Sequence, residues 1–312
     1  FMSITVILGA VTNAKYELAI MLPYEDDEAL NIATLGLIIA LVFSIILFIP
    51  VTFYNKQITD LLGSNKISFW LYCIPFIVLM IGLYNVLNYL SNRKKLYANI
   101  SKSNIYKGSI SAAVQLTAGA SKLGVSGLIL SQIIAQLVAN YSLFKSVKNY
   151  YKLTSINLHS IFNLAIKYKK FPKYTLWATL ANSLSTNLTN ILVSGVYSMT
   201  TLGFYSITQK VLAMPTSLIS GAVGQVFYQE AIEEKAKTGT SKIIFKKTLN
   251  KLFILSSIIY FVLFWIVEDL FIFIFGADWR IAGEYAQILV PLFFIQFFVS
   301  PLTMMNIIYE KN

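Results

Sequence analysis

A single lysine interrupts a long uncharged stretch of this sequence. Lys210 is the only charged residue between Lys173 and Glu230. The apolar segment that contains it begins near Leu202, so Lys210 is expected about 12 Å into a helix that rises about 1.5 Å per residue. A cation at that depth in a bilayer is costly unless an anion or a polar cavity compensates it, which makes Lys210 a candidate for binding an anionic group. The alternative is a lysine that bonds to helix carbonyls or extends to the headgroups.

Pro215 and a set of polar side chains extend this hypothesis. Pro215 cannot donate to the carbonyl of Val211, and it predicts a kinked helix. A kinked helix with a central cation can line a cavity for an anionic headgroup. The alternative for the amides is hydrogen bonding between helices. The predicted substrate-binding residues are Lys210, Gln209, Asn182, Asn190 and Gln115; Ser185, Thr186, Thr189, Gln132 and Gln136 are the further polar residues that can share the cavity.

The remaining reactive residues give no indication of catalysis. One cysteine, Cys73, excludes an internal disulfide, and one histidine, His159, makes a histidine metal site or a Ser-His-Asp triad improbable. The acidic run 25–28 fits no calcium loop and is expected to cap the following helix. We therefore predict that the chain is not an enzyme and has no metal site. We also predict no cofactor, although the protein could be coupled to a proton or sodium gradient.

The composition indicates that lipid is the main solvent of this chain. It has 312 residues, of which 56% are hydrophobic and only 12% charged, and its mean hydropathy is +0.66. Soluble domains carry about 25% charged residues. The net charge of +11 does not indicate nucleic-acid binding, because the basic residues fall in short loops between apolar runs.

Nine hydrophobic segments are predicted, and helices are preferred to strands because the runs are continuous and most are about 20 residues long. The fold class is therefore an all-α integral membrane protein with about nine transmembrane segments. The segments are 1–13, 32–54, 69–90, 104–120, 123–144, 175–198, 202–228, 252–275 and 285–308.

Basic residues alternate strictly between successive loops. One set of loops holds 20 of the 25 Lys and Arg residues, and the alternate set holds only Lys56, Lys66, Lys122 and Arg280. Positive loops remain in the cytoplasm, so this asymmetry orients the chain. It predicts a multi-pass membrane protein whose basic loops are cytoplasmic, with the lipid bilayer as a partner.

The longest cytoplasmic connection divides the chain into two lobes. Leu158, Ile161, Phe162, Ala165 and Tyr168 recur at helical spacing within it, which predicts an amphipathic helix on the inner leaflet. The predicted organisation is a front lobe at 1–145, a linker at 146–173 and a back lobe at 174–312. Both ends lie in or next to apolar runs, so each lobe is expected to be truncated.

Several stretches resemble the Wzx-like polysaccharide flippase family, within the superfamily that includes multidrug antiporters. They occur in the family's order over most of the chain. They are Tyr16–Pro23 with the acids that follow and Ala29–Asn31; Gly203–Tyr205, Lys210–Pro215 and Gln225–Ala231; and Phe275–Trp279, Ala282–Gly283, Ala286, Pro291 and Pro301.

The resemblance implies movement of a polyprenyl-diphosphate-linked oligosaccharide to the outer leaflet, for O-antigen, capsule or exopolysaccharide synthesis. It implies a transporter of the bacterial cytoplasmic membrane, with about twelve helices in two lobes around a cationic cavity and with alternating access. A polysaccharide polymerase and chain-length machinery are its candidate partners. Where the family often has Arg, this chain has Lys210, which keeps the charge but lacks the bidentate fork.

Two other functions compete with transport of a lipid-linked glycan. A cation-coupled drug antiporter needs a membrane-embedded acid, and no Asp or Glu lies deep inside a predicted segment. A membrane glycosyltransferase or polymerase needs catalytic groups in a long outer loop, and the outer loops here are short apart from 54–68.

Overall fold

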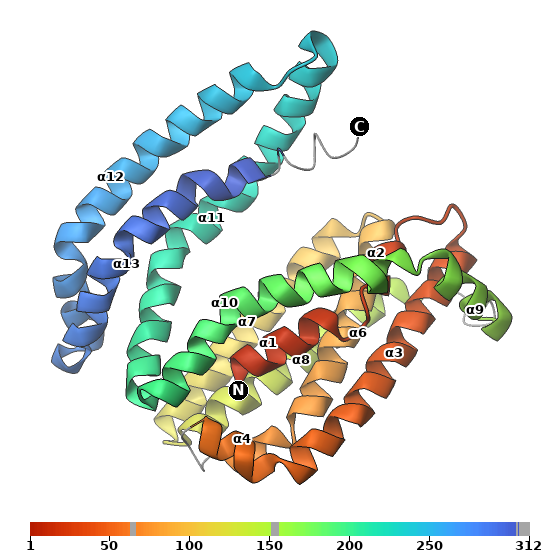
Figure 1. Ribbon diagram of the computed structural model, residues 1–312, viewed down its shortest axis with the longest axis horizontal. Helices are drawn as coiled ribbons and strands as arrows, with labels where there is room; N and C mark the ends of the chain where they lie inside the picture. The colour runs from red at the N-terminus through yellow and green to blue at the C-terminus, as the bar shows by residue number, and fades with distance from the viewer. Residues whose placement is uncertain (63–66, 151–155, 304, 306–312) are drawn as a thin grey trace. The chain divides into compact units, whose positions relative to one another are not determined.

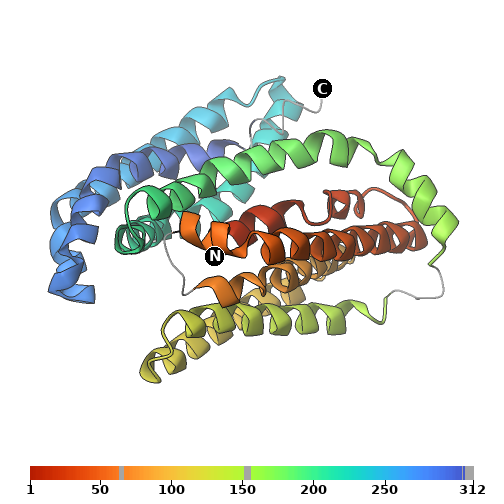
Figure 2. The same cartoon turned by 60° about the horizontal axis from the view of Figure 1, so that its bottom comes forward.

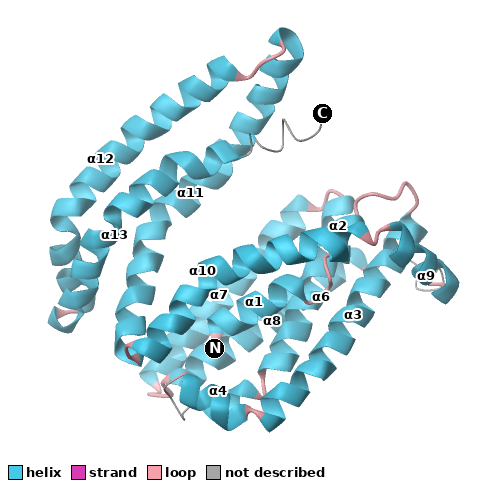
Figure 3. Cartoon of the chain, viewed as in Figure 1, coloured by secondary structure: helices cyan, strands magenta, loops and turns pink. Residues whose placement is uncertain are grey.

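The computed structural model is all-helical over the part of the chain that it describes, residues 1–62, 67–150, 156–303 and 305 (Figure 3). Contacts divide the chain into two compact units, Phe1–Val196 and Tyr197–Asn312. Unit 1 contains α1 (Met2–Val11), α2 (Tyr16–Ala19), α3 (Asp26–Phe53), α4 (Asn55–Leu61), α5 (Ser68–Leu71), α6 (Ile74–Arg93), α7 (Tyr97–Ala120), α8 (Val125–Val147), α9 (Leu158–Lys167), a π-helical turn (Phe171–Thr175) and α10 (Leu176–Val196) (Figure 1).

Unit 2 is built from three long helices, α11 (Met199–Thr238), α12 (Lys242–Phe275) and α13 (Arg280–Val299), with short 3-10 turns at Ala277–Trp279 and Ser300–Thr303. The sequence placed α10 in the back lobe, whereas in the structure this helix packs against α1 of unit 1. The predicted lobe boundaries concern the whole transporter and stay a prediction.

The membrane character of the fold is confirmed. Five stretches of the described helices are long and apolar enough to cross a bilayer, and α7, α10 and α11 are long but less apolar. The count of nine spans stays a prediction. The five stretches are Asp26–Phe53, Ser68–Arg93, Val125–Val147, Lys242–Phe275 and Ala277–Thr303.

Small residues allow the helices of unit 1 to approach closely. A Cβ atom at Gly82 of α6 would lie 2.8 Å from the Cβ of Ala40 on α3. A Cβ atom at Gly127 of α8 would lie 2.2 Å from the Cβ of Ala118 on α7. Close backbone approach is the usual way for membrane helices to gain packing energy, since lipid supplies little hydrophobic drive between them. Figure 2 shows α8 along one edge of the unit.

The predicted amphipathic linker helix is α9, which is shorter than the linker itself. Ile161 and Leu164 are buried, and α9 packs on α3, while Leu158 and Phe162 remain exposed. Asn157 caps the helix by accepting a hydrogen bond from the backbone N–H of His159 at 2.9 Å. The helix therefore buries one edge of its apolar face against protein and leaves the other edge open. Residues 151–155 of the linker lie outside the described residues.

The acidic run does stand at a helix start, but its side chains form ion pairs instead of caps. Asp26 opens α3 and pairs with Arg93 at 3.1 Å and with Lys94. Arg93 also donates to the carbonyl of Pro23 at 2.7 Å. Glu28 pairs with Lys167 of α9 at 3.4 Å. These contacts join the beginning of α3 to the end of α6 and to the linker helix.

In unit 2, α11 continues through Pro215 without ending, and Figure 1 shows this helix changing direction along its length. The Tyr260 hydroxyl of α12 donates to the carbonyl of Leu212 at 3.0 Å, one turn before the proline. Glu234 then accepts from the backbone N–H groups of Ile243 and Ile244 at 3.0 and 2.8 Å, and so caps the start of α12.

Candidate functional site

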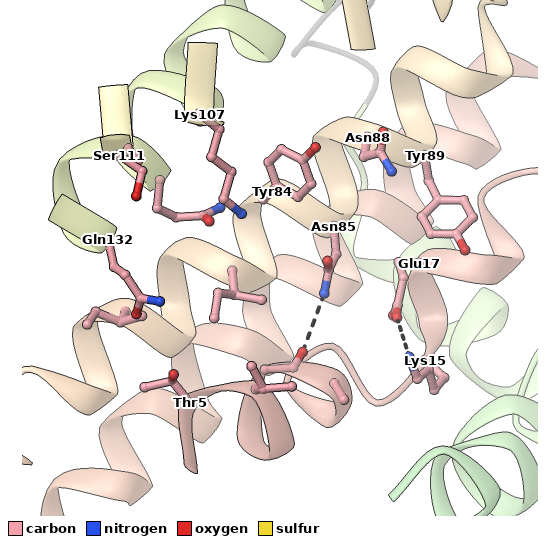
Figure 4. A pocket seen from close by; sticks show the side chains of 17 residues that line it. Thr5, Lys15, Glu17, Tyr84, Asn85, Asn88, Tyr89, Lys107, Ser111 and Gln132 are labelled. Atoms are coloured by element: carbon pink, nitrogen blue, oxygen red, sulfur yellow. Dashed lines mark hydrogen bonds and ion pairs between the residues drawn. The ribbon is translucent and has the colours of Figure 1, made fainter. Parts of the chain in front are cut away.

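A polar cavity of about 610 Å³ lies inside unit 1 (Figure 4). Its walls come from α1, the turn into α2, α6, α7 and α8. The volume falls in the range of small-molecule sites, about 300–1,000 Å³. The polar residues that line it are Thr5, Lys15, Glu17, Tyr84, Asn85, Asn88, Tyr89, Lys107, Ser111, Gln132 and Gln136.

Helix α6 supplies the largest share of this lining. Tyr84, Asn85, Asn88 and Tyr89 follow one another at spacings of one, three and one residues, so they occupy one side of the helix. On that face the side chains change from apolar at Ile81 to polar, while the rest of α6 keeps the apolar surface of a membrane helix. One wall of the cavity is therefore a strip of polar residues on one side of an otherwise apolar membrane helix.

Two asparagines, the buried Asn13 in the turn after α1 and the partly buried Asn85 on α6, form hydrogen bonds beside the cavity. The Asn13 amide donates to the carbonyls of Gly36 on α3 and Gly82 on α6, at 3.1 and 3.2 Å. Asn85 in turn donates to the Asn13 side-chain oxygen at 3.2 Å. The glycines leave room for these amides to reach the backbone, so the network joins the turn that follows α1 to α3 and α6. Figure 4 shows the Asn85 amide pointing toward α1, where the carbonyl of Gly9 lies 3.5 Å away.

A buried ion pair lies at the entrance to α2. Lys15 Nζ lies 3.3 Å from Glu17 Oε1, and the Glu17 side chain is only 3% exposed. Among the described residues, Glu17 Oε2 has no hydrogen-bond partner. Burial raises the pKa of Glu17, and the charge of Lys15 opposes that rise. Ala14 and Lys15 both have positive φ, 49° and 65°, an uncommon backbone conformation that turns the chain here.

A second lysine occupies the α7 wall. Lys107 Nζ lies 4.9 Å from the centre of the Tyr84 ring, in the geometry of a cation–π contact. The Tyr84 hydroxyl donates to Asn104 Oδ1 at 2.6 Å. No carboxylate is recorded as a partner of Lys107 within the described part of the chain. The aromatic ring thus partly compensates this cation and leaves its N–H groups available.

Amides and hydroxyls also join α7, α8 and α6. Gln115 donates to Ser111 and Ser131 at 3.0 and 3.1 Å, which links α7 to α8. Gln136 and Asn140 both donate to the carbonyl of Met80, at 3.4 and 2.9 Å. Gln115 therefore joins helices by hydrogen bonds, which is the alternative role considered for the glutamines. Gln136 also bonds between helices, and both Gln132 and Gln136 line the cavity.

The predicted site residues are divided between the two units. Gln115, Asn182 and Asn190 belong to unit 1, and Gln209 and Lys210 to unit 2. Gln115 contacts Ser111 of the cavity, and Asn190 has a buried side-chain oxygen without a partner among the described residues. None of the three in unit 1 is part of the described cavity lining.

In unit 2, Gln209 donates to the Tyr205 hydroxyl at 2.7 Å, and Lys210 is exposed on α11. No ion pair of Lys210 is recorded among the described residues. Its proposed role with the diphosphate stays a prediction.

The sequence did not single out Asn13, Glu17, Asn85 or Tyr84 as site residues. A usable signal exists for α6, where two asparagines and two tyrosines break an apolar run at helical spacing. Glu17 gives no such signal, because it lies between apolar segments and only packing buries it.

Fold and cavity together define a multi-pass, all-helical membrane protein with a polar chamber in its first unit. The described residues contain no cluster of His, Cys, Asp and Glu that could hold a metal ion. The chain belongs to the polysaccharide biosynthesis protein family, whose family model matches residues 21–283. The match confirms the resemblance to Wzx-like proteins and shows a role in polysaccharide biosynthesis. Neither the curated proteins nor the solved structures include a significant match to this chain.

Proposed function

We propose that this protein moves a polyprenyl-diphosphate-linked oligosaccharide from the cytoplasmic to the outer leaflet of the cytoplasmic membrane. The observation that carries this proposal is the polar cavity of unit 1, two of whose walls, α6 and α8, have the length and composition of membrane spans. Placing polar side chains inside a membrane protein costs free energy, so a group of them usually indicates the pathway of a polar substrate.

The cavity chemistry suits a glycan better than an apolar drug. Its amides and hydroxyls can donate and accept hydrogen bonds, which sugar hydroxyls also do. Tyr84 and Tyr89 add aromatic faces with polar tips. Lys15 and Lys107 against the single carboxylate of Glu17 leave a net positive charge, which favours a phosphate-bearing substrate.

Lys210 supplies the corresponding candidate in unit 2. It is an exposed cation on a helix with an internal proline, and Gln209 precedes it. In this proposal Lys210 contacts the diphosphate of the carrier lipid, as a point charge without bidentate geometry. A proton or sodium gradient drives the cycle, and a polysaccharide polymerase receives the product at the outer face. The protein makes and breaks no covalent bond.

The test is complementation of a bacterium that lacks its own polysaccharide flippase, using the full-length protein and surface glycan as the readout. Lys107→Gln is expected to lower glycan export about tenfold or more, since a hydrogen bond to a charged group contributes about 1.5–3 kcal/mol. Lys122→Gln removes the same charge from the turn between α7 and α8 and is the matched control. Lys210→Ala tests the site in unit 2 separately.

Export by the unmodified protein that falls in Lys107→Gln but not in Lys122→Gln supports the flippase and its cavity. Equal export by all variants at equal expression refutes the role of both lysines. Absence of glycan in the native host after deletion of the gene, restored by the unmodified copy, separates a host mismatch from a wrong function.

A cation-coupled drug antiporter is the second candidate, and Glu17 favours it. This class needs a shielded acid, and the Glu17 carboxylate is buried in the cavity with one oxygen unpartnered among the described residues. Increased resistance to cationic drugs that follows expression and is lost in Glu17→Gln would support the antiporter. Unchanged drug sensitivity together with restored glycan would exclude it.

A further inference from the structure

A second polar groove, of about 510 Å³, lies between α7 and α8 and is separate from the cavity described above. Asn99, Lys102 and Tyr106 line it from α7, at spacings of three and four residues. Tyr141, Ser142, Val138, Lys145 and Ser146 line it from α8 with the same helical periodicity. Each helix therefore contributes one lysine and one tyrosine to the same groove.

Specific contacts between the two helices form the groove. Ser103 of α7 is fully buried and donates to the carbonyl of Ala139 on α8 at 3.0 Å. Farther along the pair, Gly127 allows close contact with Ala118. These contacts hold the two helices in register and so set the backbone positions from which the two exposed lysines extend.

Within the described part of the chain, no ion pair involves the two lysines of this groove. No Asp or Glu occurs between Asp60 and Glu230, a range that includes all of α7 and α8. Among the described residues, the ion-paired acids of unit 1 bind other partners, Glu17 with Lys15, Asp26 with Arg93 and Lys94, and Glu28 with Lys167. Two lysines on facing helices repel each other, and an anion between them would remove that repulsion.

The surroundings of the groove resemble a membrane interface. Tyr106 and Tyr141 are 49% and 69% exposed, and tyrosines gather at the level of the lipid headgroups. Their neighbours Ile105 and Phe144 are exposed apolar side chains, suited to acyl chains. The excess of basic residues in this set of loops assigns the same end of the helices to the cytoplasmic side.

We propose that this groove binds the phosphodiester headgroup of an anionic phospholipid from the cytoplasmic leaflet. Lys102 and Lys145 contact the phosphate oxygens, Asn99 and Ser142 bond to the hydroxyls of the headgroup, and the acyl chains lie along the apolar surface. Basic pockets between membrane helices on the cytoplasmic side bind anionic lipids in this way. The site does not depend on which substrate the protein transports.

Native mass spectrometry of the delipidated full-length protein tests this directly. Phosphatidylglycerol is titrated against phosphatidylethanolamine, which has the same phosphate but no net charge. Each neutralised lysine is expected to weaken phosphatidylglycerol binding about fivefold, and Lys102→Gln with Lys145→Gln about 30-fold, since each basic residue near a headgroup contributes about 1 kcal/mol. Binding of phosphatidylethanolamine is expected to change little.

Two control variants separate charge at the groove from net charge and from misfolding. Lys122→Gln, at the other end of the same helix pair, removes the same charge and is expected to leave binding unchanged. Lys102→Arg with Lys145→Arg keeps both charges and is expected to retain phosphatidylglycerol. Retention by the arginine variant with loss in the glutamine variant supports the site.

Three results would overturn the proposal. The first is equal binding of the two lipids by the unmodified protein. The second is full displacement of phosphatidylglycerol by millimolar glycerol phosphate, which would make this a site for free phosphate. The third is preferential binding of a polyprenyl diphosphate that depends on Lys102 and Lys145, which would assign the groove to the carrier lipid. None of these measurements involves transport, so the flippase proposal is tested independently.

Discussion

Removing the Asn13 side chain should loosen the contact at which three helices of unit 1 meet. Asn13 is 1% exposed and takes part in three hydrogen bonds between helices, two as donor and one as acceptor. The carbonyls of Gly36 and Gly82 are helix carbonyls, so Asn13→Ala does not leave them wholly unsatisfied. Hydrogen bonds between membrane helices average about 0.6 kcal/mol each, which gives about 2 kcal/mol for the three.

The assay is thermal unfolding in detergent, followed by loss of the monodisperse peak in size-exclusion chromatography. For a unit of this size 1 kcal/mol corresponds to about 2–4 °C, so Asn13→Ala should lower Tm by about 4–8 °C. Asn163→Ala is the matched control, because Asn163 is exposed on α9. Its Tm should stay within about 1 °C, as expected for a surface change.

A double-mutant cycle with Asn85→Ala isolates the bond between the two asparagines. The expected coupling free energy is about 0.5–1 kcal/mol, which is the size of one hydrogen bond between membrane helices. Asn85 also approaches the carbonyl of Gly9, at 3.5 Å, but this contact does not involve Asn13 and cancels in the cycle. The reasoning that these amides join the helices is refuted if Asn13→Ala has the same Tm as Asn163→Ala, or if the cycle gives no coupling free energy.

Two further predictions concern the same unit. Gly82→Val places carbon atoms within about 3 Å of Ala40 and Thr12, so it should lower the free energy of unfolding by about 1–3 kcal/mol. The measurement is the fraction of purified protein that is monodisperse, which should fall. Gly108→Val, at an open position, is the control, and an equal yield from the two variants would contradict the prediction. Because burial raises the pKa of Glu17, the folded state holds this proton more tightly than the unfolded state does, so the contribution of Glu17 to stability should be complete below the usual pKa of about 4.5 and decline as the pH rises through the raised value. Tm measured against pH should therefore fall more steeply for the unmodified protein than for Glu17→Gln, and parallel curves would show that the carboxylate is not shielded.

The sequence by itself determined the solvent of this protein and the nature of its elements. Run length and charge scarcity are local properties, and a lipid-embedded backbone has few ways to satisfy its hydrogen bonds, so an all-helical membrane fold followed directly. The ordered motifs around Lys210 and Asp278 were sufficient to indicate the family, which the family model confirmed over residues 21–283. The amphipathic linker was recognisable from its periodicity, although which edge of its apolar face packs against protein was not.

Only the tertiary structure decided which polar residues meet. The arrangement of the helices around the cavity depends on contacts between residues far apart in the chain, such as the hydrogen bond from Asn13 to the carbonyl of Gly82. The Tyr16 hydroxyl likewise donates to the carbonyl of Ala165 at 2.9 Å, across 149 positions of the sequence. Glu17 is buried because α2 packs against α3 and α6, and its own sequence neighbourhood does not reveal this. Helix periodicity shows which residues share a face, but the partner of that face depends on the close approach of other helices at positions such as Gly82 and Gly127.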